Sequence, residues 1–306
     1  MPQDQRTTVP AAAPDPRRIR KIAESIINLP TLPTVVSKMI DLVDNPKTSA
    51  GSLARLISTD QALTARILKL ANSAYYGLSR EVSTVNMAIV VLGFNTVKDM
   101  GLSLSVLDMF KDTDNRKFFD AGRFWEHSIG CGIASRLLAR KFRNKLAGEA
   151  FVAGLLHDIG KVVLKQYCAP EFGQIMHRVW EKDDDLEQAE LETIGTGHGQ
   201  VGGWLAVKWN LPGIIADSIT HHHAPWEAAT DKAFVSLVNL ADYLCHVSAI
   251  GNSGRKTVKP VDTRIWEILQ GALIAVGSED IDGLVADLLL EFDRSETFLS
   301  FIQDET

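Results

Sequence analysis

The chain carries histidines and aspartates in an order that is typical of a metal site. All eight histidines follow residue 126, so the first third offers almost no side chain for metal or proton chemistry. The candidate ligands are His127, His157, Asp158, His198, His222, His223 and Asp242. Nitrogen and oxygen ligands without a thiolate suit iron, manganese, zinc or magnesium better than copper(I) or an iron–sulfur cluster. We therefore predict that one or two divalent or transition-metal ions (iron, manganese or zinc) bind here.

Asp158 is the candidate ligand that could bind two cations at once. It follows His157 directly, and adjacent helical side chains point about 100° apart, so the two approach a metal from different directions. Each oxygen of the Asp158 carboxylate can bind a different cation, which makes this residue a candidate bridge. Asp242 lies in the apolar segment 238–244, where a carboxylate is costly to bury unless it is paired or binds a metal. Two cations can activate water and clamp a phosphoryl group.

Each residue also has a structural interpretation. A single histidine is more often a capping or surface residue than a ligand, and the triplet from His221 to His223 before Pro225 is compatible with a solvated turn. The order of the whole set, with each member on or beside a helical segment, is what favours metal binding. His177 and His246 have no place in that order, and we interpret them as structural.

Lys161 is the second candidate catalytic residue, after Asp158. It follows Asp158 by three residues and lies on the same helical face if the helix continues. Its ammonium group could meet a substrate phosphate as a point charge. A solvated lysine near a helix end is an equally compatible interpretation.

The elements that must position these residues are predicted to be helices. Apolar residues recur at helical spacing from Leu63 to Ala71, from Phe151 to Ile159 and from Leu284 to Phe292. Asp60 is a candidate cap for the first of these helices. The β-branched run 89–91 is short and also accommodates helical spacing, and we find no convincing strand pattern. We expect an all-α protein of about 12–15 short helices.

Composition limits the classes to which the protein can belong. Of the 306 residues, 45% are hydrophobic, which is enough for a full core and excludes wholesale disorder. The chain has 32 Lys and Arg against 38 Asp and Glu, so its net charge of −6 lacks the basic footprint of a dedicated nucleic-acid binder. We interpret the basic clusters at residues 17–21 and 136–145 as solvated helix faces, and nucleic acid is disfavoured as a partner.

The cysteines and the lengths of the apolar runs indicate the cellular compartment of the protein. Cys131, Cys168 and Cys245 form no CxxC pair and are typical of small buried side chains in a reducing compartment. No apolar run reaches the roughly 18 residues that a membrane span needs. Residues 1–16 contain four of the eleven prolines and no apolar centre of a signal peptide. We expect a disordered tail at residues 1–16 and a cytoplasmic protein without a membrane span.

Several motifs in the first third occur together. They are the runs at residues 29–33, 57–64 and 70–76 and the element from Ala88 to Gly93. With them, the segment 29–107 resembles the HDOD family, a helical branch of the HD superfamily found in bacterial signalling proteins. The resemblance continues through residues 157–161, 198–202 and 222–225, and covers about residues 28–245. One mild departure is Gln61, where the family commonly has proline after the aspartate.

The resemblance implies both a fold and a ligand set. Many HDOD domains resemble HD phosphohydrolases in shape but have lost the metal ligands and act as regulatory modules, whereas this sequence retains the pattern. By resemblance to the metal-dependent HD phosphohydrolases, one ion would be held by His127, His157, Asp158 and Asp242, and a second by Asp158, His198, His222 and His223. His221 would stay outside the set, and Lys161 would lie beside the scissile phosphate.

Two departures limit what the resemblance implies. The segment 224–227 lacks the Gly-Tyr-Pro signature of the cyclic-di-GMP phosphodiesterase branch, which disfavours that substrate. Arg123 lies one turn before His127, where some relatives have a carboxylate that supports a third ion. We therefore expect at most two ions.

We expect an HDOD or HD-like multi-helix domain in two lobes. Residues 17–112 would form the amino-terminal helical lobe and residues 113–250 the HD-like metal-binding lobe. Residues 251–306 would pack on the second lobe as further helices, around Trp266, Leu269, Leu284, Leu288 and Phe292.

Two functions from different classes remain open at this stage. The first is a metal-binding regulatory module of bacterial signal transduction that acts through a signalling protein partner. The alternative is a metal-dependent phosphohydrolase, either a phosphodiesterase or a phosphomonoesterase, that acts on a nucleotide or another phosphate ligand through a di-metal centre. The retained ligand order and Lys161 favour the second, and the usual role of HDOD domains favours the first.

Overall fold

The computed structural model describes residues 31–42, 49–72, 81–110, 119–142 and 145–293. Within these ranges the regular structure is helical and includes no β-strand, which confirms the all-α prediction. The tail at residues 1–16 and the basic cluster at residues 17–21 lie outside the described residues. The boundaries of the two lobes therefore stay a prediction.

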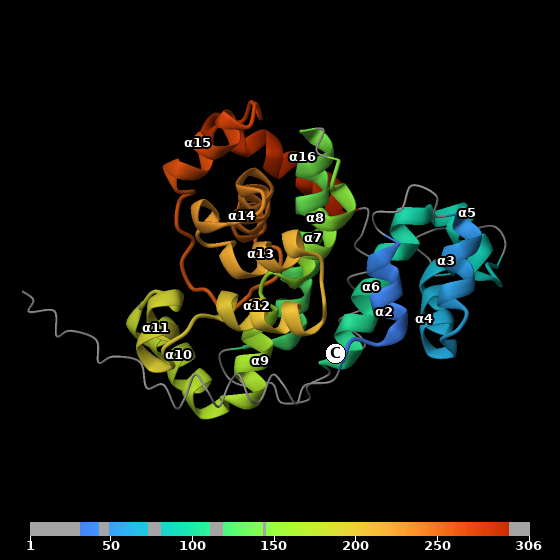
Figure 1. Ribbon diagram of the computed structural model, residues 1–306, viewed down its shortest axis with the longest axis horizontal. Helices are drawn as coiled ribbons and strands as arrows, with labels where there is room; N and C mark the ends of the chain where they lie inside the picture. Colours follow the sequence, from blue (N-terminus) through green and yellow to red (C-terminus); the bar gives the residue numbers. More distant parts are fainter. Residues whose placement is uncertain (1–30, 43–48, 73–80, 111–118, 143–144, 294–306) are drawn as a thin grey trace, which may run out of the picture.

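The amino-terminal part is a group of short helices, drawn in blue and blue-green in Figure 1. They are α2 (Thr34–Asp41), α3 (Ala50–Ile57), α4 (Gln61–Ala71), α5 (Val85–Leu92) and α6 (Phe94–Met109). The run 89–91 lies within α5 and is helical. Asp60 caps α4 as predicted, because its Oδ1 accepts a hydrogen bond of 3.0 Å from the Leu63 amide.

The remaining helices form the part of the molecule drawn from green to red in Figure 1. They are α7 (Ala121–Lys141), α8 (Ala147–Leu156), α9 (Ile159–Tyr167), α10 (Ala169–Lys182), α11 (Leu186–Thr193), α12 (His198–Lys208), α13 (Gly213–His221), α14 (Lys232–Val247), α15 (Thr263–Gly271) and α16 (Ile281–Asp293). Two short 3₁₀ helices, η2 (Pro225–Glu227) and η3 (Ser278–Asp280), join them. The long helix α7 packs against both α8 and α14, so these three helices form the centre of this part.

Glycines allow the helices that carry the candidate ligands to approach closely. A Cβ at Gly154 of α8 would overlap the backbone of Cys131 on α7. A Cβ at Gly160 of α9 would overlap the carbonyl oxygen of His198, at the start of α12. Only glycine fits such contacts. The glycine-rich stretch before His198 is a turn that leads from α11 into α12.

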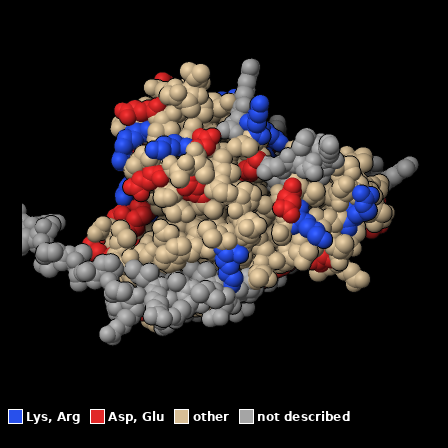
Figure 2. Space-filling model, viewed as in Figure 1, with Lys and Arg blue, Asp and Glu red and all other residues tan. Residues whose placement is uncertain are grey.

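Buried apolar side chains form one main cluster that extends from α2 to α16. The two parts of the chain therefore share a core. Of the carboxy-terminal residues predicted to pack there, Leu269, Leu284 and Leu288 are buried, while Trp266 and Phe292 are partly buried against the cluster. The face in Figure 2 shows Lys and Arg side chains scattered among Asp and Glu, without a continuous basic surface over its described residues.

No single helix of the described ranges is both long enough and apolar enough to cross a membrane. Among the described residues, one pair of helices, α5 and α6, reaches that length and composition when taken together, and the two are bent by 120° relative to each other.

Candidate metal centre

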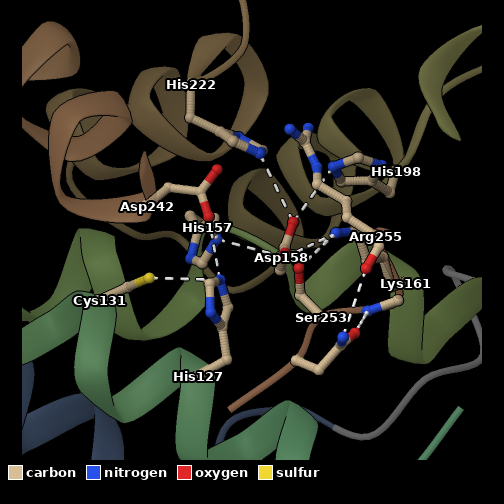
Figure 3. Close-up of polar contacts among 12 residues, drawn as sticks. His127, Cys131, His157, Asp158, Lys161, His198, His222, Asp242, Ser253 and Arg255 are labelled. Carbon is tan, nitrogen blue, oxygen red and sulfur yellow. Dashed lines mark hydrogen bonds and ion pairs between the residues drawn. The ribbon is translucent and has the colours of Figure 1, made fainter. Parts of the chain in front are cut away.

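The seven predicted ligands converge from five separate segments (Figure 3). His127 comes from α7, His157 and Asp158 from the turn between α8 and α9, His198 from the first position of α12, His222 and His223 from the turn after α13, and Asp242 from α14. Two of these helices begin at a capping aspartate. The Asp120 carboxylate accepts a hydrogen bond from the Arg123 amide at the start of α7, and the Asp231 carboxylate accepts one from the Phe234 amide at the start of α14.

The first group of possible ligands lies between α7 and α14. His127 Nε2 is 2.9 Å from Asp242 Oδ1, and His157 Nε2 is 3.6 Å from the same oxygen. One ligand atom from each of His127, Cys131, His157 and Asp242 lies within 4.8 Å of all the others. All four side chains are buried, so this group is sheltered from water.

The second group surrounds the other side of Asp158. Asp158 Oδ1 is 3.2 Å from His198 Nε2 and 3.6 Å from His222 Nε2. His223 Nε2 is 2.9 Å from His198 Nε2, and one ligand atom from each of these four residues again lies within 4.8 Å of the others. Asp158 Oδ2 instead lies 3.3 Å from His157 Nε2, in the first group. The two oxygens thus face different groups, as a bridging carboxylate requires.

Three buried ligand atoms show that these residues fit metal ions. His157 Nε2, Asp158 Oδ1 and His222 Nε2 have no hydrogen-bond partner within the described part of the chain. Buried polar atoms are almost always paired, so three such atoms facing one centre need an explanation. Metal ions satisfy nitrogen and carboxylate donors of this kind.

Hydrogen bonds at Nδ1 orient the histidine rings so that Nε2 faces the centre. His157 Nδ1 donates to the carbonyl of Gly154 (2.7 Å), and His222 Nδ1 to that of Ile219 (2.9 Å). His127 is held in the same way through the carbonyl of Ile250, at 3.2 Å. Rings fixed through one nitrogen present the other nitrogen as a ligand, which is usual for metal-binding histidines.

The charges at the centre favour ionised carboxylates. Burial opposes ionisation of Asp158, but the charges of His157 and Lys161 outweigh it and hold the Asp158 pKa well below its ordinary value. The Asp242 pKa is held low against burial by His246 and by the nearby rings of His127 and His157.

The histidines of the centre differ in protonation. Burial lowers the pKa of His127 and the pKa of His222 to about 4 in each case, so both rings are neutral at neutral pH and able to bind a cation. Burial also opposes a charge on His157, but the Asp158 and Asp242 carboxylates raise its pKa to about 10. A metal must therefore displace a proton from His157.

Lys161 is buried and not solvated. Its Nζ donates to Asp158 Oδ2 at 2.7 Å and to Ser253 Oγ at 3.3 Å, and the residue is only 1% exposed. The ammonium group thus lies directly beside the bridging candidate. This position is compatible with a contact to a bound phosphate.

Several residues at the centre were not among the predicted ligands. Glu190 is fully buried and accepts from both the amide and Nδ1 of His198, at 2.9 and 2.7 Å. His246, interpreted from the sequence as structural, has its Nε2 3.2 Å from Asp242 Oδ1. Cys131 Sγ is 3.4 Å from His127 Nε2. His221 instead points to Asp217, at 3.6 Å, outside both groups.

A cleft of about 230 Å³ adjoins the centre. His223, Asp242 and His246 line its inner end, and exposed residues such as Lys259 line the other. Its walls include Trp226, Asn239, Tyr243, Arg255 and Val261. Arg255 donates to His223 Nε2 at 2.9 Å and pairs with Glu187, so a cationic side chain lies where the cleft meets the second group. Small molecules can therefore reach the candidate ligands.

Residues 29–225 match the sequence model of the HDOD domain, which is more than half of the chain. The chain belongs to the HDOD family. The match runs from the segment before α2 to η2 and includes every predicted ligand except Asp242, which follows it on α14.

Three solved structures resemble this HDOD protein over nearly its whole length. An HDOD domain protein of unknown function from Geobacter sulfurreducens is 29% identical, with a TM-score of 0.75 over 94% of this chain and 97% of the other. A candidate signal transduction protein from Marinobacter aquaeolei VT8 is 20% identical, with a TM-score of 0.78 over 94% of this chain and 65% of the other. A candidate phosphohydrolase from Shewanella amazonensis SB2B is 23% identical, with a TM-score of 0.68 over 92% and 98%. At such identities the last two show the fold alone.

A curated relative is longer than this HDOD protein. An uncharacterized protein of Treponema pallidum (strain Nichols) is 27% identical over 225 residues, which are 72% of this chain. The chain spans 43% of the length of that relative.

Proposed function

We propose that this HDOD protein is a metal-binding regulatory module of signal transduction. The proposal is carried by the convergence of His157, Asp158 and His222, whose buried ligand atoms have no hydrogen-bond partner among the described residues. One ion would be held by His127, His157, Asp158 and Asp242, and a second by Asp158, His198, His222 and His223. Metal ions supply Lewis acidity and positive charge beside the two carboxylates.

Helix α7 supports a regulatory output because it connects the centre to the amino-terminal helices. His127 lies at the centre, and Arg136, nine residues later on the same helix, forms an ion pair with Asp99 on α6. Asp99 is only 5% exposed, so this ion pair is nearly buried. A rigid helix that bears on two sites is a physical basis for coupling them. Membership of the HDOD family supports output through a protein partner.

Amide hydrogen exchange tests this proposal. Adding zinc or manganese to the metal-stripped protein should slow exchange in the segments that carry the ligands and also in α6, because Arg136 of α7 pairs with Asp99 of α6. Asp158→Ala should remove both effects. Slower exchange confined to the ligand segments would contradict the regulatory part of the proposal, and unchanged exchange everywhere would contradict metal binding itself.

The cleft favours one alternative, a metal-dependent phosphohydrolase. A phosphate ester in the cleft would lie beside Arg255 and the ligands His223 and Asp242, all of which line it. Lys161 would then orient a phosphate oxygen from its position beside Asp158. This alternative shares its metal centre with the first proposal.

Phosphate release from a panel of nucleotides and cyclic dinucleotides tests the alternative. Lys161→Met should keep the metal and lower turnover by about 100-fold, because it removes the ammonium group beside the reacting phosphate. Lys165→Met, which removes a buried ammonium group one turn later on α9, is the matched control and should stay close to wild type. If the metal-replete protein and its Asp158→Ala variant behave identically on the whole panel, the enzyme hypothesis is wrong.

A further inference from the structure

Cys131 belongs to the first group of possible ligands. It follows His127 by four residues on α7, so both side chains project from the same face of the helix. Its Sγ lies 3.4 Å from His127 Nε2 and points at that ring in Figure 3. A ligand atom from each of His157 and Asp242 completes the group, with all four atoms within 4.8 Å of one another.

A second observation indicates that Cys131 lies in a ligand group and is not simply a buried apolar side chain. His157 Nε2 is fully buried, faces the same point and has no hydrogen-bond partner in the described residues. Asp242 contributes a carboxylate that is 4% exposed. The thiol thus adds a sulfur to the two nitrogens and one oxygen of this group, beside the bridging oxygen of Asp158, and zinc binds all of these donor types.

Cys245 provides an internal comparison. It is as completely buried as Cys131 and lies on α14, three residues after Asp242. It approaches Cys131 closely enough for the two thiols to interact, yet it is not a member of the ligand group. Packing alone accounts for Cys245, because a free buried cysteine behaves as a small apolar side chain. Packing alone does not explain why Cys131 Sγ lies 3.4 Å from His127 Nε2.

We infer that Cys131 is a thiolate ligand of the first ion. The inference rests on the proposed metal centre and adds to it, because the set implied by family resemblance contains only nitrogen and oxygen ligands. Thiolates favour zinc and other borderline or soft ions, whereas manganese and magnesium prefer oxygen. The first site therefore selects zinc or iron(II). The second site, with Asp158 and three histidines, has no sulfur within the described group and is less selective.

Cobalt(II) substitution tests the inference, because a cobalt–thiolate bond produces a strong near-ultraviolet charge-transfer band that nitrogen and oxygen ligands do not. The cobalt-loaded wild-type protein should show the band, Cys131→Ser should lose it, and Cys245→Ser should keep it. Cys131→Ser should also lower zinc affinity by at least about tenfold while changing manganese affinity much less.

Several outcomes would overturn the inference. Cobalt bound to the wild-type protein without the band, or a band that persists in Cys131→Ser, would exclude the thiolate ligand and leave the metal centre intact. A wild-type protein that binds no cobalt would instead contradict the proposed function. If Cys131→Ser does not fold, X-ray absorption at the zinc edge of the wild-type protein gives the same answer, since a sulfur ligand should appear at about 2.3 Å and its absence would exclude it.

Discussion

At the scale of single residues, the centre depends on hydrogen bonds that orient the histidine rings. His127, His157 and His222 each use Nδ1 to donate to a backbone carbonyl. His198 differs, because its Nδ1 donates to the carboxylate of Glu190. A carboxylate partner fixes the ring and makes the opposite nitrogen a stronger ligand.

Glu190→Gln should therefore weaken metal binding. The substitution keeps the shape of the side chain and removes the charge behind His198, so we expect about a 10- to 100-fold loss of metal affinity with the fold retained. Competition with a chromophoric chelator measures the affinity. Glu192→Gln, on the same helix but in an ion pair with Arg178 at the surface, should bind metal like wild type. Equal affinity in wild type and Glu190→Gln would show that Glu190 does not position His198.

The ligands could be predicted from the sequence, whereas several residues that surround them could not. Asp242 was found because a carboxylate is costly to bury inside an apolar helical segment, and His157 and Asp158 were found from the order of histidines and aspartates along the chain. Cys131 and His246 were not, although each follows a predicted ligand by four residues, a spacing that places both on the ligand's helical face. For Glu190 no sequence signal exists, because its role depends on α11 meeting the start of α12.

At the scale of helices, close packing sets the positions of the ligands. Gly160 of α9 touches the start of α12 so closely that a methyl group would overlap the carbonyl oxygen of His198. Any larger residue must push α12 away, and α12 carries one ligand of the second group.

Gly160→Ala should weaken both the fold and the second metal site. We expect a loss of about 1–3 kcal/mol in the free energy of unfolding, measured with urea, together with lower metal affinity. Gly173→Ala is the matched control on α10, because nothing lies within 4 Å of its added methyl group. This change should be neutral or stabilising by up to about 1 kcal/mol. A Gly160→Ala protein as stable as Gly173→Ala would contradict the packing argument.

The start of α15 should give a pH-dependent contribution to stability. Asp262 accepts from the side chain of Arg264 at 2.6 Å and from its amide at 3.0 Å, and these bonds lower its pKa to about 2. Because an unfolded aspartate has a pKa of about 3.9, the stabilisation is fully present above about pH 4 and is lost as the pH falls through about 2.

Asp262→Asn isolates this effect, because the amide oxygen still caps the helix. The variant should be less stable than wild type by about 0.2–1 kcal/mol at neutral pH, as expected for an exposed ion pair, and the difference should shrink as the pH falls below about 4. Asp262→Ala, which also removes the cap, should cost about 1 kcal/mol more. Thermal unfolding at several pH values measures both, and a pH-independent difference would contradict the assignment.

Helical periodicity was enough to predict the all-α fold, but not where the helices end. The break between α8 and α9 falls at His157 and Asp158, where neither proline nor glycine marks a turn. Both side chains contact residues far along the chain, Asp242 for His157 and His198 for Asp158, and no local pattern encodes these contacts. Lys161 nevertheless contacts Asp158, which is compatible with the shared helical face that the three-residue spacing suggested.

At the scale of the whole molecule, one apolar cluster joins the amino-terminal helices to the helices around the centre. The ligands come from α7, α12, α14 and two turns, so a bound ion connects segments that are far apart in the sequence. An ion that binds only the folded protein must stabilise it. Membership of the HDOD family explains why the order of the motifs predicted that these distant segments meet. Helical periodicity alone could not predict this convergence.

The metal content of the purified protein tests the central claim most directly. Elemental analysis should find about one to two equivalents of iron, manganese or zinc per chain, and Asp158→Ala should lose them because both groups share this carboxylate. His221→Gln should keep the wild-type content, since its ring pairs with Asp217 outside the centre. A metal-free wild-type protein, or full metal content in Asp158→Ala, would contradict the account.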